Sequence, residues 1–245
     1  MKKFFTLALA SLMLLSCSKD SIWNTQEQGQ LSVNVEQGAS IFVETKAAVN
    51  TDNFYLKIVK NGVEVYYKKV SESKSPITLP TGTYTVSAEN MTAAEALTDR
   101  GKQRLADTKE NVTVSANQTN TITLNCEMVN SKVSFAFDET FKSAFEMENT
   151  QITESSRGIV WTKNATLDEE NEEIAYFEPS TLNYTIKTKR AGEDKTYTGQ
   201  VEMAAKTWHK LTVKASVVNG QLGITVTADD SVVAAPGDIT VDPYN

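Results

Sequence analysis

The feature that most constrains the fold is a repeated alternation of apolar and polar residues in short runs. Leu31, Val33 and Val35 alternate with polar neighbours, as a half-buried strand requires. Comparable runs recur along the chain, with turn signals roughly every ten residues. This spacing favours β-sandwiches over a parallel α/β sheet.

Two Asn-Gly pairs give the sharpest local predictions. Asn61-Gly62 and Asn219-Gly220 each separate two alternating runs that are rich in β-branched and aromatic residues. Asn and Gly supply the two positive φ angles of a type I′ turn, whose twist matches the flanking strands. We therefore expect one hairpin at each pair.

The remaining elements follow from the same alternation. Further strands are expected at 76–79, 83–88, 111–115, 120–127, 132–137, 158–161, 174–177, 182–188, 197–203 and 208–218. Two stretches break the pattern, 92–99 and 139–146. In the second, Phe141 and Phe145 have helical i,i+4 spacing, so each stretch is expected to form a helical turn or two.

The N-terminus indicates export. Lys2 and Lys3 precede an apolar run over 4–15, which is too short for a hydrocarbon core that takes about 20 helical residues to cross. It is typical of a signal peptide. The run ends at Ser16-Cys17, which resembles the lipobox of bacterial lipoproteins. The alternative is an ordinary cleaved signal in which the cysteine is incidental.

The lipobox resemblance implies an anchored protein. Residues 1–16 would be removed, and Cys17 would carry a diacylglyceryl thioether and a third, palmitate-like acyl chain. Two or more chains hold a protein stably on a membrane, so the membrane is an expected partner. The polar stretch 17–29 then serves as a flexible tether.

The folded part is expected to be all-β, with two tandem β-sandwich domains. About 230 residues remain after the signal peptide, which exceeds the commonest domain size of about 100 to 150 residues. The predicted boundaries are 30–128 and 129–245. A single large sandwich or a β-barrel of the same strands is the alternative.

The net charge and the cysteine content argue against a nucleic-acid partner, a disulfide within the chain and a reactive thiol. The formal charge of −7 argues against a nucleic-acid partner, whose phosphates require Lys and Arg. Acylation of Cys17 would leave Cys126 without an intramolecular disulfide partner. Alternation places Cys126 on the same strand face as Ile122 and Leu124, which predicts a buried and unreactive thiol.

Catalytic and metal-binding patterns are scarce. His209 is the single histidine, and we interpret it as a residue on the surface of a strand. A Ser-His-Asp triad would have to use it, and one histidine with one cysteine makes a poor zinc site. The acidic run 168–173 lacks the spacing of a calcium loop. We therefore predict a non-enzyme without metal or cofactor.

The aromatic residues suggest one place where a ligand could make contact. Trp23, Trp161 and Trp208 are expected to fill the cores. Tyr66 and Tyr67 are adjacent, so alternation must turn one of the two rings outward. An exposed ring can pack against the apolar face of a sugar, which makes Tyr66 and Tyr67 candidate ligand contacts.

Three segments carry a family resemblance. Residues 29–33 (GQLSV), 79–86 (LPTGTYTV) and 124–135 (LNCEMVNSKVSF) resemble an uncharacterised domain family of Bacteroidetes lipoproteins, which is itself similar to fimbrillins, the subunits and accessory proteins of surface pili. The resemblance implies two transthyretin-like or immunoglobulin-like sandwiches on a lipid anchor, at the outer membrane and on the cell surface. It brings no catalytic residues.

This sequence departs from the fimbrillin pattern at one point. In fimbrillin-type pilins a terminal strand of one subunit fills a groove in the next, after proteolysis at an arginine early in the first domain. The first arginine here is Arg100, which counts against a polymerising stalk subunit. The remaining possibilities are a pilus anchor, a pilus tip protein and an independent surface lipoprotein. The tail 231–245 is expected to close its own sheet, and the alternative is that it adds a strand to the sheet edge of a neighbouring molecule.

The sequence thus predicts a fimbrillin-like structural or adhesion protein without catalysis. Its partners would be pilus subunits, other surface proteins or glycans. The alternative is a carbohydrate-binding outer-membrane lipoprotein that assists glycan uptake. A hydrolase is a third, weaker alternative.

Overall fold

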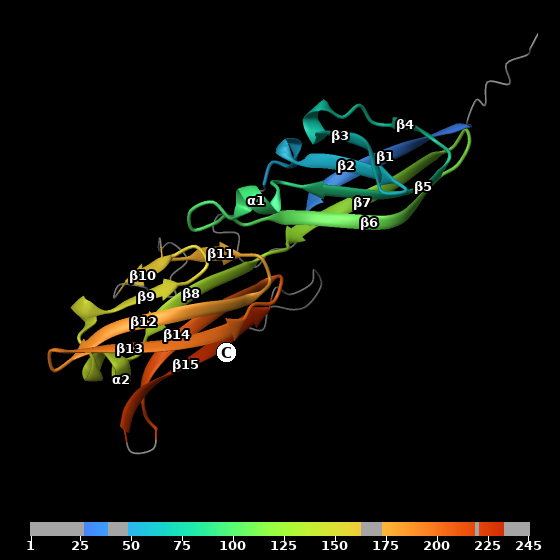
Figure 1. The fold of residues 1–245 in the computed structure, drawn as a ribbon. Coiled ribbons are helices and arrows are strands. Elements are labelled where there is room, and N and C mark those ends of the chain that lie inside the picture. Colours follow the sequence, from blue (N-terminus) through green and yellow to red (C-terminus); the bar gives the residue numbers. More distant parts are fainter. Residues whose placement is uncertain (1–26, 39–48, 163–172, 219–220, 233–245) are drawn as a thin grey trace, which may run out of the picture.

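The structure is a computed structural model that describes residues 27–38, 49–162, 173–218 and 221–232. Strands dominate these residues, and short helical turns connect them (Figure 1). The prediction of an all-β fold is confirmed. Within the described ranges, no helix is long and apolar enough to cross a membrane.

The N-terminal half forms one seven-stranded sheet. Its strands are β1 (Gln28–Gln37), β2 (Tyr55–Lys60), β3 (Val63–Lys69), β4 (Ile77–Pro80), β5 (Gly82–Glu89), β6 (Leu105–Val114) and β7 (Thr119–Met128), in the order β3-β2-β5-β6-β7-β1-β4. β6 and β7 share only two residue pairs, whereas β7 runs parallel to β1 from Gln30 to Gln37. The sheet therefore bends between β6 and β7 into two layers around one core.

The core of this half comes from the inward positions of the alternating strands. Leu31, Ile58, Val86 and Leu124 have no measurable exposure and come from four different strands. The first predicted hairpin is confirmed, because β2 and β3 pair around Asn61 and Gly62, with φ angles of 51° and 78°. Both angles are those that a type I′ turn requires.

The C-terminal half forms two four-stranded sheets that face each other. Its strands are β8 (Ser131–Phe137), β9 (Gln151–Glu154), β10 (Val160–Thr162), β11 (Ala175–Phe177), β12 (Thr181–Arg190), β13 (Glu193–Glu202), β14 (Thr207–Val218) and β15 (Gln221–Val232), in the orders β10-β9-β12-β13 and β11-β8-β14-β15. Phe135 of one sheet packs edge-on against Trp161 of the other, with ring centroids 4.9 Å apart. The two sheets thus share one core.

Two further predictions are confirmed in this half. β14 and β15 pair along their full length up to Val218 and Gln221, as the second hairpin requires, although its turn at 219–220 lies outside the described residues. Helix α2 (Glu139–Ala144) forms where Phe141 and Phe145 have helical spacing, and their rings stack with centroids 4.7 Å apart.

The other expected helical stretch, in the N-terminal half, forms α1 (Ala93–Ala96), which begins with a capping box between Thr92 and Glu95.

The short helices complete the list of elements. In the described parts of the chain, single 3₁₀ turns lie at η1 (Thr51–Asn53), η2 (Val70–Glu72) and η3 (Met147–Asn149). The turn η2 begins the connection between β3 and β4.

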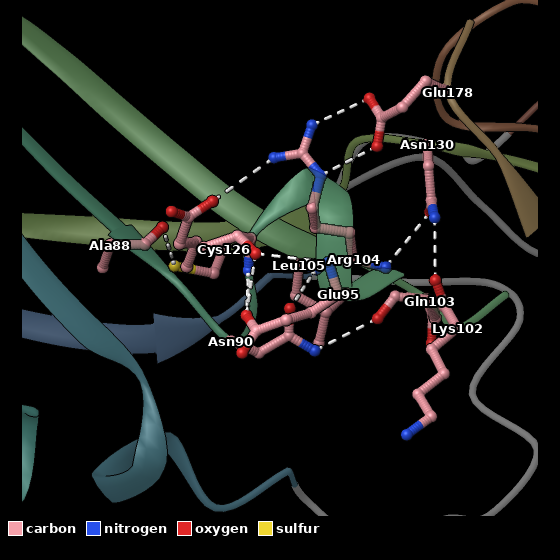
Figure 2. A network of polar contacts seen from close by, with 12 residues as sticks. Ala88, Asn90, Glu95, Lys102, Gln103, Arg104, Leu105, Cys126, Asn130 and Glu178 are labelled. Atoms are coloured by element: carbon pink, nitrogen blue, oxygen red, sulfur yellow. Dashed lines mark hydrogen bonds and ion pairs between the residues drawn. The ribbon is translucent and has the colours of Figure 1, made fainter. Parts of the chain in front are cut away.

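A buried polar joint connects the two halves where β7 continues into β8 (Figures 1 and 2). Asn130 is fully buried in this connection. Its Oδ1 accepts a hydrogen bond from the Arg104 backbone N–H at 3.1 Å, and its Nδ2 donates to the Lys102 carbonyl at 2.8 Å. The Arg104 guanidinium donates to both carboxylate oxygens of Glu178, each at 3.0 Å.

One tryptophan crosses the joint. Trp208 is the second residue of β14 in the C-terminal half, yet its side chain packs into the core of the N-terminal half. Its Nε1 donates to the Ser134 hydroxyl at 2.9 Å. A large aromatic side chain buried across a joint adds apolar area to the polar contacts.

The loop after α1 forms the second part of the joint. The Arg157 guanidinium donates to the Leu97 carbonyl at 2.8 Å, and the Tyr176 backbone N–H donates to the Arg100 carbonyl at 2.7 Å. Gly101 follows Arg100 directly and has a φ of +83°. A Cβ added there would lie 2.5 Å from the Tyr176 carbonyl oxygen, so only glycine fits this approach.

We predict that Gly101→Ala destabilises the protein more than Gly192→Ala does. Both glycines have φ near +80°, but a Cβ on Gly192 would meet nothing within 4 Å. Backbone strain of about 1 kcal/mol is therefore common to both, and the clash with the joint adds about 1–3 kcal/mol at Gly101 alone. Urea unfolding of the two variants measures the difference. Equal losses of stability would contradict the close approach at Gly101.

Candidate functional site

The two predicted contact residues lie on β3, which is an edge strand. Among the described strands, β3 pairs with β2 alone. Tyr66 is half-buried and packs against the core, whereas Tyr67 is 43% exposed on the outer face. The structure therefore places the two rings on opposite faces of the sheet and does not bring them into one site.

A β-bulge decides which of the two rings faces outward. Ile58 pairs with Tyr66 and Val59 pairs with Glu64, so Val65 is left without a partner on β2. An uninterrupted register from the Asn-Gly turn would pair Ile58 with Val65 and would send Tyr66 outward. The extra residue shifts the register by one and exchanges the two faces.

The outward ring has an aromatic partner that the sequence reading missed. Tyr67 stacks on Tyr55 with centroids 5.3 Å apart and ring planes within 9°. The two are diagonal neighbours, because Tyr55 pairs with Lys69 and Tyr67 pairs with Lys57. Partial burial raises the pKa of Tyr67, and the nearby Glu89 carboxylate adds to this shift. The phenol stays protonated at neutral pH.

Exposed apolar side chains continue along the same edge strand, where the pairing of Val63 with Lys60 places Val63 on the Tyr66 face of the sheet. Val63 is 64% exposed and Val65 is 46% exposed. An unpaired strand edge that also carries exposed apolar residues can pair with another chain, and most proteins protect such edges. We refer to Val63, Val65, Tyr67 and Tyr55 as the β3 surface.

The inward ring borders a cavity between β3 and β4. The cavity has a volume of about 390 Å³. It is lined by Tyr66, Lys68, Glu72, Lys74, Pro76, Ile77 and Thr78. The sequence offered no signal for it, because its walls come from the two unpaired edges of the sheet and from the segment that connects them.

The prediction for Cys126 is confirmed. Its side chain is fully buried on β7, and the thiol lies 3.5 Å from the Ala88 carbonyl oxygen, to which it donates a weak hydrogen bond (Figure 2). Burial, with a smaller contribution from the Asp107 carboxylate, raises the pKa of the thiol to about 12. A protonated and inaccessible thiol is a poor nucleophile.

The prediction for His209 is wrong. The residue is 1% exposed, and its Nε2 accepts a hydrogen bond from the Ala204 backbone N–H at 3.0 Å. It lies on β14, where the neighbouring Trp208 is buried in the joint. Both faces of the strand are covered there, so alternation no longer separates a buried face from an exposed face.

The other candidate residues divide between core, joint and undescribed segments. Trp161 and Trp208 are buried, as predicted, whereas Cys17, Trp23 and 168–172 lie outside the described residues. Glu173, the last residue of the acidic run, forms an ion pair with Arg100 at 3.1 Å. In the described part of the chain, no group of three or more His, Cys, Asp or Glu could hold a metal ion.

A family profile described as a domain of unknown function, DUF4493, matches residues 27–243. The chain belongs to this family. The match confirms the resemblance to an uncharacterised domain family, and it spans every strand of this DUF4493 protein. No curated protein sequence matches the chain significantly.

Several solved structures resemble the DUF4493 chain at low sequence identity. A fimbrial assembly protein from Parabacteroides distasonis is 11% identical, with a TM-score of 0.46 over 82% of this chain and 99% of that one. The tip fimbrial protein Mfa3 from Porphyromonas gingivalis is 7% identical, with a TM-score of 0.44 over 83% and 100%. A candidate polysaccharide-binding protein from Bacteroides thetaiotaomicron is 14% identical, with a TM-score of 0.41 over 80% and 98%.

We predict that Cys126 of the folded protein resists thiol reagents at pH 8. Its pKa of about 12 lies well above the ordinary 9.0, so almost no thiolate is present. In the unfolded chain the thiol has its ordinary pKa of 9.0, so it ionises at lower pH than the thiol of the folded protein. Its titration therefore lowers the free energy of unfolding as pH rises from 9.0 to about 12.

Labelling with an iodoacetamide probe, with and without urea, measures this protection. A Cys126→Ser variant corrects for labelling elsewhere. Rapid labelling of Cys126 in the absence of urea would contradict its burial.

Proposed function

We propose that the chain is a lipid-anchored cell-surface protein with a structural or adhesive role and no catalysis, of fimbrillin-like type. In this proposal residues 1–16 are a signal peptide, Cys17 carries the lipid, and 17–29 are the tether. Residues 30–128 and 129–245 are two sandwich domains. The outer membrane is the proposed location.

The observation that carries the adhesive role is the β3 surface. It combines an unpaired strand edge with a stacked tyrosine pair and exposed valines, which is an arrangement suited to contact with another protein. Aromatic side chains are enriched where proteins meet, because they bury a large area with little loss of conformational freedom.

The joint supports a structural role. Arg104, Arg157 and Trp208 connect the halves through charge-assisted hydrogen bonds and apolar packing. Such contacts keep a fixed angle between the two sandwiches. A protein that presents a binding surface away from a membrane benefits from that stiffness.

Glycan binding is the second candidate function. The cavity beside Tyr66 favours it, because an aromatic wall surrounded by polar and charged side chains suits a polyhydroxylated ligand. The role would be to hold glycans for a neighbouring outer-membrane importer.

We predict that Cys17→Ala abolishes incorporation of an alkyne-labelled palmitate and shifts the protein from the membrane to the soluble fraction. Removing the thiol removes the atom that bears the thioether-linked lipid, and a protein without acyl chains lacks stable anchoring. Cys126→Ser is the matched control and should keep the label. Retention of label by Cys17→Ala would contradict the lipid anchor.

We predict that deletion of the gene reduces adhesion of the cells to protein-coated or cell-coated surfaces, and that Val65→Lys reproduces the loss. A lysine on the β3 surface places a charge where apolar contact is proposed, and edge lysines disfavour strand pairing. Val217→Lys is the matched control, since Val217 is a 71% exposed strand valine in the C-terminal half.

Adherent cells are counted for the deletion strain complemented with each variant, after equal surface amounts are verified. Equal adhesion of the deletion and parent strains would contradict an adhesive role. Hydrolysis of glycosides or peptides by the purified chain, if lost on a single substitution, would contradict the absence of catalysis.

A further inference from the structure

The cavity beside Tyr66 lies where the N-terminal sheet fails to close. β3 and β4 are the two ends of the strand order, and residues 70–76 connect them directly. In the described part of the chain, β3 pairs only with β2 and β4 only with β1. The backbone N–H and C=O groups along both facing edges are therefore available to a ligand in the gap.

The lining of this cavity is unusually basic for an acidic protein. The lining contains two lysines, Lys68 and Lys74, and one acid, Glu72. The whole chain, in contrast, has a formal charge of −7. None of these three side chains makes an ion pair within the residues that the structure describes. Two lysines and one carboxylate give the lining a net positive charge, which favours an anionic ligand.

The remaining walls add an aromatic and a polar contribution. Tyr66 presents its ring beside Lys68, whose Nζ lies 5.8 Å from the ring centroid. Thr78 on β4 supplies a hydroxyl on the opposite wall. A ligand that fits has a carboxylate for the lysines, an apolar ring face for the tyrosine, and hydroxyls for Thr78, Glu72 and the strand edges.

We propose that the cavity between β3 and β4 binds a hexuronate, the carboxylate-bearing sugar unit of acidic glycans. Its volume of about 390 Å³ lies near the lower end of ligand pockets, which span about 300 to 1,000 Å³, so it accommodates one or two sugar rings. The carboxylate lies between Lys68 and Lys74. This inference deepens the second candidate function above and rests on it for the source of the glycan.

An added β-strand suits the gap less well than a sugar. A bound strand presents alternate side chains that need matching apolar pockets, whereas the cavity walls carry Lys68, Glu72 and Lys74. The connection 70–76 also closes one end of the gap, which limits the run of an extended chain. An extended peptide therefore serves as a competing ligand in the test.

The experiment is calorimetric titration of the full chain in detergent with a galacturonate disaccharide and with a glucuronate-containing disaccharide. We expect at least one of them to bind, and affinity to fall as salt is raised, because the contact is ionic. Lys68→Gln and Lys74→Gln should each weaken binding about threefold to tenfold, and the double variant by more than about tenfold. The preferred disaccharide indicates the source of the glycan.

Three controls make the result specific. Lys57→Gln changes the outer face of the same sheet and should leave the affinity unchanged. A galactose disaccharide without the carboxylate should bind at least about tenfold more weakly than the hexuronate. A peptide of residues 231–245 should not compete for the cavity.

The inference is overturned if neither hexuronate binds, if the neutral disaccharide binds equally well, or if the double lysine variant binds as the parent does. Displacement of the sugar by the peptide would also overturn it in favour of strand addition. Folding of each variant is checked by thermal unfolding, and Lys68→Arg, which keeps the charge, should retain binding. Failure of sugar binding leaves the adhesion test on Val65 unaffected, so the two proposals fail separately.

Discussion

The buried polar joint at Asn130 is the constraint on which the arrangement of the molecule depends. A buried amide must satisfy its donor and its acceptor, because an unpaired polar group costs about 1–3 kcal/mol. Asn130 satisfies both with the backbone of 102–104, and the carbonyl of Asn130 accepts from the Lys206 backbone N–H at 3.1 Å. This set of bonds exists in only one relative orientation of the two halves.

Arginine chemistry strengthens the same joint. The Glu178 carboxylate, helped by Glu89, raises the pKa of Arg104 against the effect of burial, so the planar guanidinium stays charged and holds a bidentate pair. Arg157 instead donates to backbone carbonyls, and burial lowers its pKa. The two arginines thus contribute differently to the joint, Arg104 through a bidentate ion pair and Arg157 through hydrogen bonds to carbonyl groups.

The joint also determines which surfaces remain free. It occupies the ends of β6 and β7 and the loop after α1, whereas β3 and β4 lie on the side of the N-terminal half away from it (Figure 1). The two ends of the N-terminal sheet are thereby left open. The β3 surface and the cavity beside Tyr66 are two faces of this one opening, which is why both proposals concern the same strand.

Local patterns in the sequence determined the strands other than β9, both Asn-Gly hairpins and the burial of Cys126, because alternation and turn chemistry act over a few residues. The tertiary structure alone decided three features. The bulge at Val65 turned Tyr67 outward instead of Tyr66, the joint buried His209, and the unclosed sheet placed Lys68 opposite Thr78. Each depends on how different strands pair and pack, which the alternation within a single strand does not encode.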